Sequence, residues 1–188
     1  MKNGIGNRKL PKLKLLMIDD QKMVCEAVKI NLKGEEDIEF NYCCDPKKAL
    51  AEASQIKPHI ILQDLILGEE NGLDLLKVYR STKEIKDTPV IVLSSKEEAN
   101  IKAEAFQLGA NDYMVKFPEK LELVARIRYH ASGYINKHAR DLAFQQLVNN
   151  QKMLEHRNAF VKEMFSKYLT EDIVNNELLI GNSTHTRL

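Results

Sequence analysis

The stretch IKPHIILQDLILGEENGLDLL (56–76) contains the two kinds of segment from which the fold is predicted. The run HIILQ (59–63) has the length and composition of a strand that is buried on both faces. The dipeptide Asn71-Gly72 indicates a turn. The apolar residues that follow recur at helical spacing: Leu73, Leu76 and Tyr79. A buried strand, a turn and an amphipathic helix are therefore expected in this order.

The same alternation extends outward from this stretch in both directions. Four further apolar runs are typical of buried strands: LKLLMI (13–18), IEFNYC (38–43), PVIVLS (89–94) and DYMV (112–115). The segments between them are marked by apolar residues at helical spacing: Met23, Ala27, Ile30 and Leu32; Ala49, Leu50 and Ala53; Ala103, Phe106 and Leu108. Asp45-Pro46 suits the start of a helix, and Gly109 suits the end of one.

Five strands that alternate with helices predict an α/β fold with one parallel sheet covered on both faces. The connections must be right-handed crossovers. We expect a flavodoxin-like, doubly wound, five-stranded parallel sheet in the order 2-1-3-4-5, followed by an extended C-terminal helix. In that order the first and third strands are neighbours at the switch point, so a ligand should bind beyond their carboxyl ends.

The chain changes character after Pro118. Residues 119–168 contain no proline and a single glycine, Gly133, which predicts one long helix or two helices. Leu147, Leu154 and Val161 are seven residues apart and suit a coiled-coil seam. Phe144 and Phe165 fit the alternate seam positions, whereas Gln151 and Asn158 are polar. A parallel dimeric helix and a helix packed on its own domain both remain open.

These patterns divide the chain into a polar tail (1–12), an α/β domain (13–132) and a helical arm (133–188). Hydrophobic residues make up 44% and the net charge is +1, which argues against a dedicated nucleic-acid binder. The N-terminus lacks the apolar core of a signal peptide, and the apolar runs are too short for a membrane span. Three cysteines without metal-site spacing are expected to be reduced and apolar: Cys25, Cys43 and Cys44. We expect a cytoplasmic protein.

Three carboxylates end neighbouring strands of the predicted sheet. Asp19 and Asp20 follow the first strand, and Asp64 follows the third. Like charges at such short range need a cation or protons to coexist. Mg²⁺ fits best, because it binds through one or two carboxylates together with water and phosphate oxygens. Asp20 by itself could instead be the N-cap of a helix.

A hydroxyl and an ammonium group are predicted at the same edge of the sheet. Ser94 ends the fourth strand and Lys116 follows the fifth. Together they supply the hydrogen-bond donor and the positive charge that an incoming phosphoryl group requires. Each of these residues is common alone, but the combination with the three aspartates is specific for a phosphate site.

At these residues the sequence resembles the receiver domain of bacterial response regulators, over about residues 12–132. The resemblance implies that Asp64 is the phosphoacceptor, which takes its phosphoryl group from a histidine kinase or a histidine phosphotransfer protein. It implies the following further roles: Asp20, Asp64 and the backbone carbonyl of Ile66 as Mg²⁺ ligands, Asp19 as a ligand acting largely through water, Ser94 as the switch hydroxyl, Tyr113 as the aromatic switch residue and Lys116 as the partner of the phosphate. Phosphorylation would then draw Ser94 toward the phosphoryl group, turn Tyr113 inward, and alter both the surface of the fourth and fifth helices and dimerisation.

The sequence departs from the receiver pattern at two places. Leu67 and Gly68 stand where receivers often have Met-Pro. Phe117 separates Lys116 from Pro118, so that a cis peptide bond, if one is present, is expected at Phe117–Pro118. Gly72 falls where receivers usually have glycine.

Two local resemblances concern the output of the protein. Three stretches are similar to receivers of Wsp-type diguanylate cyclase regulators: IKPHIILQDLILGEENGLDLL (56–76), VIVLSSKEEA (90–99) and GANDYMVKFPEKLELVARIRYH (109–130). The chain nevertheless has no Gly-Gly-[Asp/Glu]-Glu-Phe motif. The tail FVKEMFSKYLTEDIVNNELL (160–179) is similar to the segment that precedes class III nucleotide cyclase domains. These resemblances imply a nucleotide cyclase as the output, with a stand-alone receiver that acts by protein–protein contact as the alternative.

The predicted function is a phosphoacceptor switch and not an enzyme, and the protein is expected to form a homodimer and to have no nucleic-acid or membrane partners. An aspartate-based phosphatase usually needs a second aspartate two residues after the nucleophile, where this chain has Ile66. A nucleotide- or flavin-binding module is disfavoured because no glycine-rich loop follows the first strand. A vestigial site that serves constitutive dimerisation is disfavoured because Asp19, Asp20, Asp64, Ser94 and Lys116 are all present.

Overall fold

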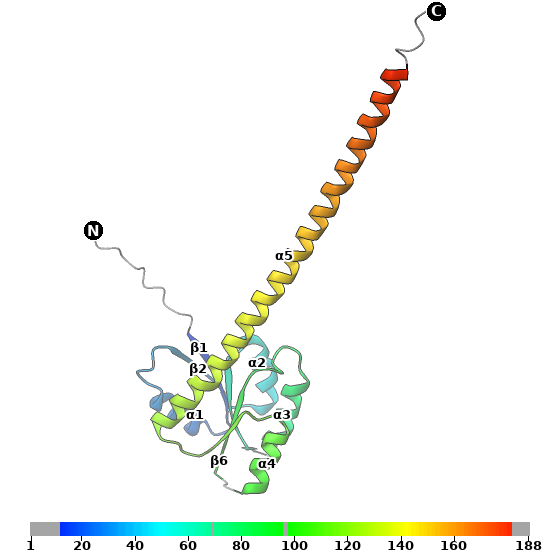
Figure 1. Ribbon diagram of the computed structural model, residues 1–188. Coiled ribbons are helices and arrows are strands. Elements are labelled where there is room, and N and C mark those ends of the chain that lie inside the picture. Colours follow the sequence, from blue (N-terminus) through cyan, green and yellow to red (C-terminus); the bar gives the residue numbers. More distant parts are fainter. Residues whose placement is uncertain (1–11, 69, 96–97, 182–188) are drawn as a thin grey trace, which may run out of the picture. The chain divides into compact units, whose positions relative to one another are not determined.

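The computed structural model describes residues 12–68, 70–95 and 98–181. Five parallel strands form the central sheet: β1 (Leu13–Ile18), β2 (Ile38–Cys43), β3 (Ile60–Asp64), β6 (Val90–Ser94) and β7 (Asp112–Val115). Their order is β2-β1-β3-β6-β7, and β1, β2 and β6 are labelled in Figure 1. This arrangement confirms the predicted doubly wound sheet, because β6 and β7 are the fourth and fifth strands of the predicted order.

A small hairpin that the sequence did not predict follows β3. Its strands, β4 (Ile66–Leu67) and β5 (Glu70–Asn71), pair antiparallel and form a separate two-stranded sheet. Gly68 lies in the turn between them with φ +65°, a left-handed conformation that glycine adopts without strain. The hairpin is too short for an alternation of apolar and polar residues to reveal it in the sequence.

The helices follow the strands as expected: α1 (Lys22–Asn31), α2 (Ala49–Ile56), α3 (Gly72–Ser81), α4 (Ala99–Gln107) and α5 (Lys120–Gly181). Asp45 accepts a hydrogen bond from the Lys47 N–H at the start of a short 3-10 helix, η1 (Pro46–Lys48), which leads into α2. Gly109, with φ +97°, follows the end of α4 as predicted. Asn71 does not form the expected turn. Its side chain instead caps α3 by accepting from the Leu73 N–H.

The two faces of the sheet carry separate apolar clusters. One combines sheet residues with α1 and α5, through side chains such as Val28 and Ile127. The other combines sheet residues with α2, α3 and α4, through side chains such as Leu76 and Ala105. The sheet is therefore buried on both sides, as the apolar composition of its strands indicates.

The apolar residues that marked α1 and α4 in the sequence are not all in the core. In α1, Met23 and Ile30 are exposed, and the sheet contacts Val24, Cys25 and Val28 instead. In α4, Ala103 and Phe106 are exposed and Ala105 is buried. Both helices have apolar residues on more than one face, and packing against the sheet selects one of these faces.

α5 is a single helix, which resolves the choice between one helix and two. The chain separates into two units after Lys137, so that α5 begins in the α/β unit and continues through the second.

Cys25 and Cys43 are buried, and all three cysteines are free thiols. Among the described residues, no helix is both long and apolar enough to cross a membrane.

Candidate phosphoacceptor site

Three acidic side chains meet at the carboxyl edge of the sheet because β1 and β3 are neighbours. Ile18 pairs with Gln63, so Asp19 and Asp64 lie in adjacent positions just beyond this pair. Carboxylate oxygens of Asp19, Asp20 and Asp64 lie within 4.8 Å of one another. The predicted gathering of the three aspartates is therefore present in the fold.

The three carboxylates have different surroundings. Asp19 is fully buried, and one of its oxygens accepts from the Gln21 N–H at 2.9 Å. Gln21, and not Asp20, is the N-cap residue of α1. The Oδ1 atom of Asp20 is buried and has no hydrogen-bond partner among the described residues. A buried carboxylate oxygen without a hydrogen-bond donor lowers the stability of the fold. Coordination of this oxygen to a hard cation, which prefers oxygen ligands, would remove that cost. The cluster therefore fits Mg²⁺.

Lys116 supplies the positive charge of the site from the loop after β7. Its Nζ lies 2.8 Å from Asp19 Oδ2 and 2.7 Å from Asp64 Oδ2, and its side chain is only 9% exposed. The peptide bond that follows, Lys116–Phe117, is cis. The expectation of a cis bond at Phe117–Pro118 is thus wrong. The cis bond is the one that directly follows Lys116, even though the next residue, Phe117, is not a proline.

Burial and pairing act against each other on the ionisation of this site. Burial raises the pKa of Asp64 above its usual range, and the hydrogen bond from Lys116 opposes this only in part. Burial alone would lower the pKa of Lys116, but its hydrogen bonds to Asp19 and Asp64 outweigh burial and raise it. One ammonium group thus faces three carboxylates, which leaves an excess of negative charge that a divalent cation can neutralise.

Ser94 and Tyr113 lie on the two strands beyond β3. Ser94 ends β6, is 1% exposed and pairs in register with Val115. Tyr113 is 8% exposed and packs in the cluster shared with α3 and α4. The ammonium group of Lys102 lies 5.4 Å from the centre of its ring. The ring that was expected to turn inward on phosphorylation is therefore already buried in this structure.

The loop after Asp64 is shaped by two glycines. A Cβ atom on Gly72 would lie 2.3 Å from the backbone oxygen of Asp64, a distance at which the backbone would have to move. A Cβ atom on Gly68 would lie 3.6 Å from Asp20 Oδ2, which is ordinary contact. Ile66 donates its N–H to the Asp64 carboxylate. Its carbonyl remains a predicted ligand of the cation.

Gln63 is a residue of the site that the sequence analysis passed over. It is fully buried beside Asp64, its amide nitrogen donates to the Gly72 carbonyl, and its Oε1 has no partner among the described residues. The bond joins the end of β3 to the start of α3 and so holds the loop that carries the acidic site. A polar residue inside the apolar run HIILQ was the signal that could have identified it.

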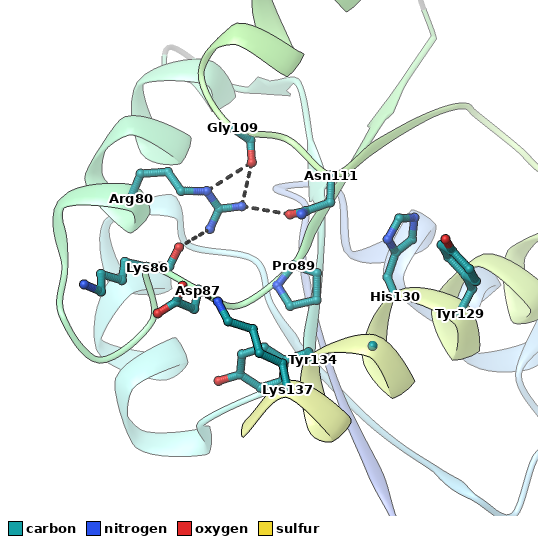
Figure 2. A pocket seen from close by; sticks show the side chains of 11 residues that line it. Arg80, Lys86, Asp87, Pro89, Gly109, Asn111, Tyr129, His130, Tyr134 and Lys137 are labelled. Carbon is teal, nitrogen blue, oxygen red and sulfur yellow. Dashed lines mark hydrogen bonds and ion pairs between the residues drawn. The ribbon is translucent and has the colours of Figure 1, made fainter. Parts of the chain in front are cut away.

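A cleft of about 470 Å³ lies at the opposite edge of the sheet, beside the starts of β6 and β7 (Figure 2). Arg80 reaches across one side of it. Its guanidinium donates to the carbonyls of Gly109, Lys86 and Thr88 and to the side chain of Asn111. These bonds use the guanidinium to join the end of α3 to two loops. The cleft is therefore built around a structural arginine and is separate from the acidic cluster.

A family model for the response regulator receiver domain matches residues 15–128. The chain is 30% identical over 115 residues to the DNA-binding response regulator MtrA of Mycolicibacterium smegmatis, and this match covers 61% of the chain and 49% of MtrA. It is 32% identical over 116 residues to the response regulator ArlR of Staphylococcus saprophyticus, with 61% of the chain and 50% of ArlR covered. The chain thus spans about half the length of the curated relatives it matches.

The fold comparison agrees with the sequence comparison. The receiver domain of the Francisella response regulator 1452 superposes with a TM-score of 0.58 at 29% identity, over 64% of this chain and 98% of that one. The matched family model covers more than half of the chain and includes every residue of the acidic cluster together with Ser94 and Lys116. The chain belongs to the response regulator receiver domain family.

Proposed function

We propose that Asp64 accepts a phosphoryl group from a phosphohistidine of a histidine kinase or a histidine phosphotransfer protein, with Mg²⁺ bound by the acidic cluster. One observation carries the proposal: three carboxylates within 4.8 Å share a single buried ammonium group that touches two of them. A structural ion pair needs no third carboxylate, and it would only be destabilised by the buried Asp20 oxygen, which has no hydrogen-bond partner among the described residues.

Each residue has a distinct task in the proposed transfer. A carboxylate oxygen of Asp64 attacks phosphorus, and the bond from phosphorus to the donor histidine breaks, with its electron pair returning to the imidazole nitrogen. Lys116, held between Asp19 and Asp64, neutralises charge on the phosphoryl oxygens, and Ser94 donates a hydrogen bond to one of them. Asp19, Asp20, Asp64 and the carbonyl of Ile66 would hold Mg²⁺, which supplies charge neutralisation at the same oxygens.

Phosphorylation is proposed to act on the surface formed by α4, β7 and α5. It adds about 1.5 to 2 negative charges at Asp64 and draws Ser94 toward the phosphoryl group. Because Tyr113 is already buried, the phosphoryl group would stabilise this inward position and not create it. To change the ratio of the two arrangements of this surface from 1:99 to 99:1, phosphorylation must stabilise one over the other by about 5.5 kcal/mol.

The output is proposed to be an interaction with a second copy of the chain through the exposed side of α5 beyond Lys137. MtrA is named as a DNA-binding regulator, and this gives no support to the cyclase output that the tail resemblance implies. The cyclase-like stretch is helical through Gly181. The exposed apolar side chains along α5 are the observation in favour of a second copy.

The test is the mass of the protein after incubation with acetyl phosphate and Mg²⁺. The unaltered protein should gain one phosphoryl group, and Asp64→Ala should gain none. Asp74→Ala is the matched control, because Asp74 is an exposed aspartate that pairs with Lys77 on α3. EDTA should prevent the gain. A gain that survives Asp64→Ala would refute the assignment.

A further inference from the structure

The second unit of the chain exposes an apolar face that is unusual for a lone helix. Between residues 138 and 169, where the side chains of α5 are described, the exposed large apolar side chains are Leu142, Phe144, Leu147, Met153, Leu154, Phe160, Val161, Met164, Phe165, Tyr168 and Leu169. At about 100° per residue, Phe144, Leu147, Val161, Phe165 and Tyr168 lie on the same side of α5 as Leu154, whereas Leu142, Met153 and Phe160 lie about 100–120° round the helix from it. An exposed apolar stripe of this length indicates a partner.

The polar residues within the seam of this helix differ in charge from those on its opposite side. With about 3.6 residues per turn, Lys152, His156 and Glu163 lie on the side away from the seam of Leu147, Leu154 and Val161. The polar residues within the seam are both uncharged amides, Gln151 and Asn158. Between Phe144 and Tyr168 the seam thus holds no charged residue and keeps groups that can both donate and accept hydrogen bonds, although Arg140 occupies the equivalent position seven residues before Leu147.

We propose that α5 pairs with α5 of a second copy in parallel and in register, so that Asn158 and Gln151 each face the same residue of the second copy. The inference rests on the pairing proposed above and adds its orientation and register. An amide that faces its own copy can donate to it and accept from it, which satisfies both members of the pair. A polar residue at such a seam position specifies register and the number of strands.

The antiparallel arrangement is disfavoured by the same amides. Turning one helix around places Asn158 against Val161 of the second copy and leaves its donors and acceptors without partners. The antiparallel arrangement would bring Glu155 near Lys162 of the second copy, which is an attraction, whereas the parallel one brings Arg157 near Lys162, which is a repulsion between like charges. Both contacts are at the exposed rim, where interactions between charges contribute little, so the amides of the seam decide the orientation.

Oxidative crosslinking of single added cysteines tests the orientation. In the parallel pair, Leu154→Cys should form a covalent dimer with itself, whereas Lys152→Cys on the charged side should not. The unaltered protein, with Cys25 and Cys43 buried, is the background control. A monomer in sedimentation, or crosslinking of Leu154→Cys only when it is mixed with Phe165→Cys, would overturn the proposal.

Substitution of the seam amide tests the register. Asn158→Leu should change a single dimer into a mixture of species larger than a dimer, measured by sedimentation. Asn149→Leu, on the charged side of the helix, should remain a dimer. Equal behaviour of the two variants would show that Asn158 has no part in the pairing. Phosphorylation of Asp64, measured by mass, is read out separately, so failure of the pairing and failure of the phosphoacceptor site are distinguishable.

Discussion

The two edges of the central sheet use charged groups in opposite ways. At the carboxyl edge, Lys116 pairs with two of three clustered carboxylates, and Oδ1 of the third, Asp20, lacks a partner among the described residues. At the amino edge, the Arg80 guanidinium makes five hydrogen bonds, four of them to backbone carbonyls. The carboxyl edge thus keeps an excess of negative charge, which can bind a cation and, together with that cation, a phosphoryl group. The amino edge uses its charge to hold loops together.

The largest expected effect is at the amino edge. Arg80→Met should lower the free energy of unfolding by about 3 kcal/mol, because it leaves the carbonyls of Gly109, Lys86 and Thr88 without this donor. Urea unfolding measures the change. Lys77→Met, in an exposed pair with Asp74 on the same helix, is the control and should change the stability by less than about 0.5 kcal/mol. A similar small change for both variants would contradict the structural role of Arg80.

Gly72→Ala tests the backbone that carries the acidic edge. Its Cβ would approach the Asp64 carbonyl to 2.3 Å, so the start of α3 must shift, at a cost of about 2 kcal/mol. Phosphorylation by acetyl phosphate should slow as well, because the shift moves the loop after Asp64. Gly133→Ala is the control, since a Cβ there meets nothing within 4 Å. Unchanged stability and labelling in Gly72→Ala would show that the loop adapts freely.

Asp112, at the start of β7, gives a pH-dependent test of the amino edge. Burial alone would raise its pKa, but hydrogen bonds from Arg126, from the Tyr113 N–H and from His130 outweigh burial and lower it. A lowered pKa in the folded state means that the ionised form stabilises the protein above the ordinary aspartate range, and that this is lost as the pH falls through the folded-state pKa. Asp112→Asn should therefore cost about 1 kcal/mol at pH 7 and less toward pH 3. A cost that does not vary with pH would contradict this assignment.

The last expected effect is similar in size to that of Asp112→Asn, but it has the opposite sign and is at the carboxyl edge. Because burial raises the pKa of Asp64, its ionised form opposes folding at neutral pH when no cation is bound. Asp64→Asn should therefore raise the free energy of unfolding by about 1 kcal/mol in EDTA. In Mg²⁺ the difference should shrink or reverse, because the unaltered protein gains stability from binding. Destabilisation of Asp64→Asn in EDTA would mean that Lys116 already compensates the site.

Much of the fold could be predicted because the strands are continuous apolar runs. The bounds predicted for β1, β2 and β7 agree with the structure, and β3 and β6 begin one residue later than expected. Helix faces were harder to predict. Met23 and Ile30 share the spacing of a buried stripe, yet α1 turns Val24 and Val28 to the sheet.

The sequence by itself determined the membership of the acidic site. Asp19, Asp20, Asp64, Ser94 and Lys116 all follow or end a buried strand, and parallel strands bring their carboxyl ends to one edge. The reach of Lys116 past Phe117 to two carboxylates was decided by the tertiary structure, as were the burial of Tyr113, the cap at Asn71 and the bonds of Arg80. The physical reason is that strand order follows from local patterns of apolar residues, whereas these contacts join residues far apart in the chain through side-chain geometry that no spacing encodes.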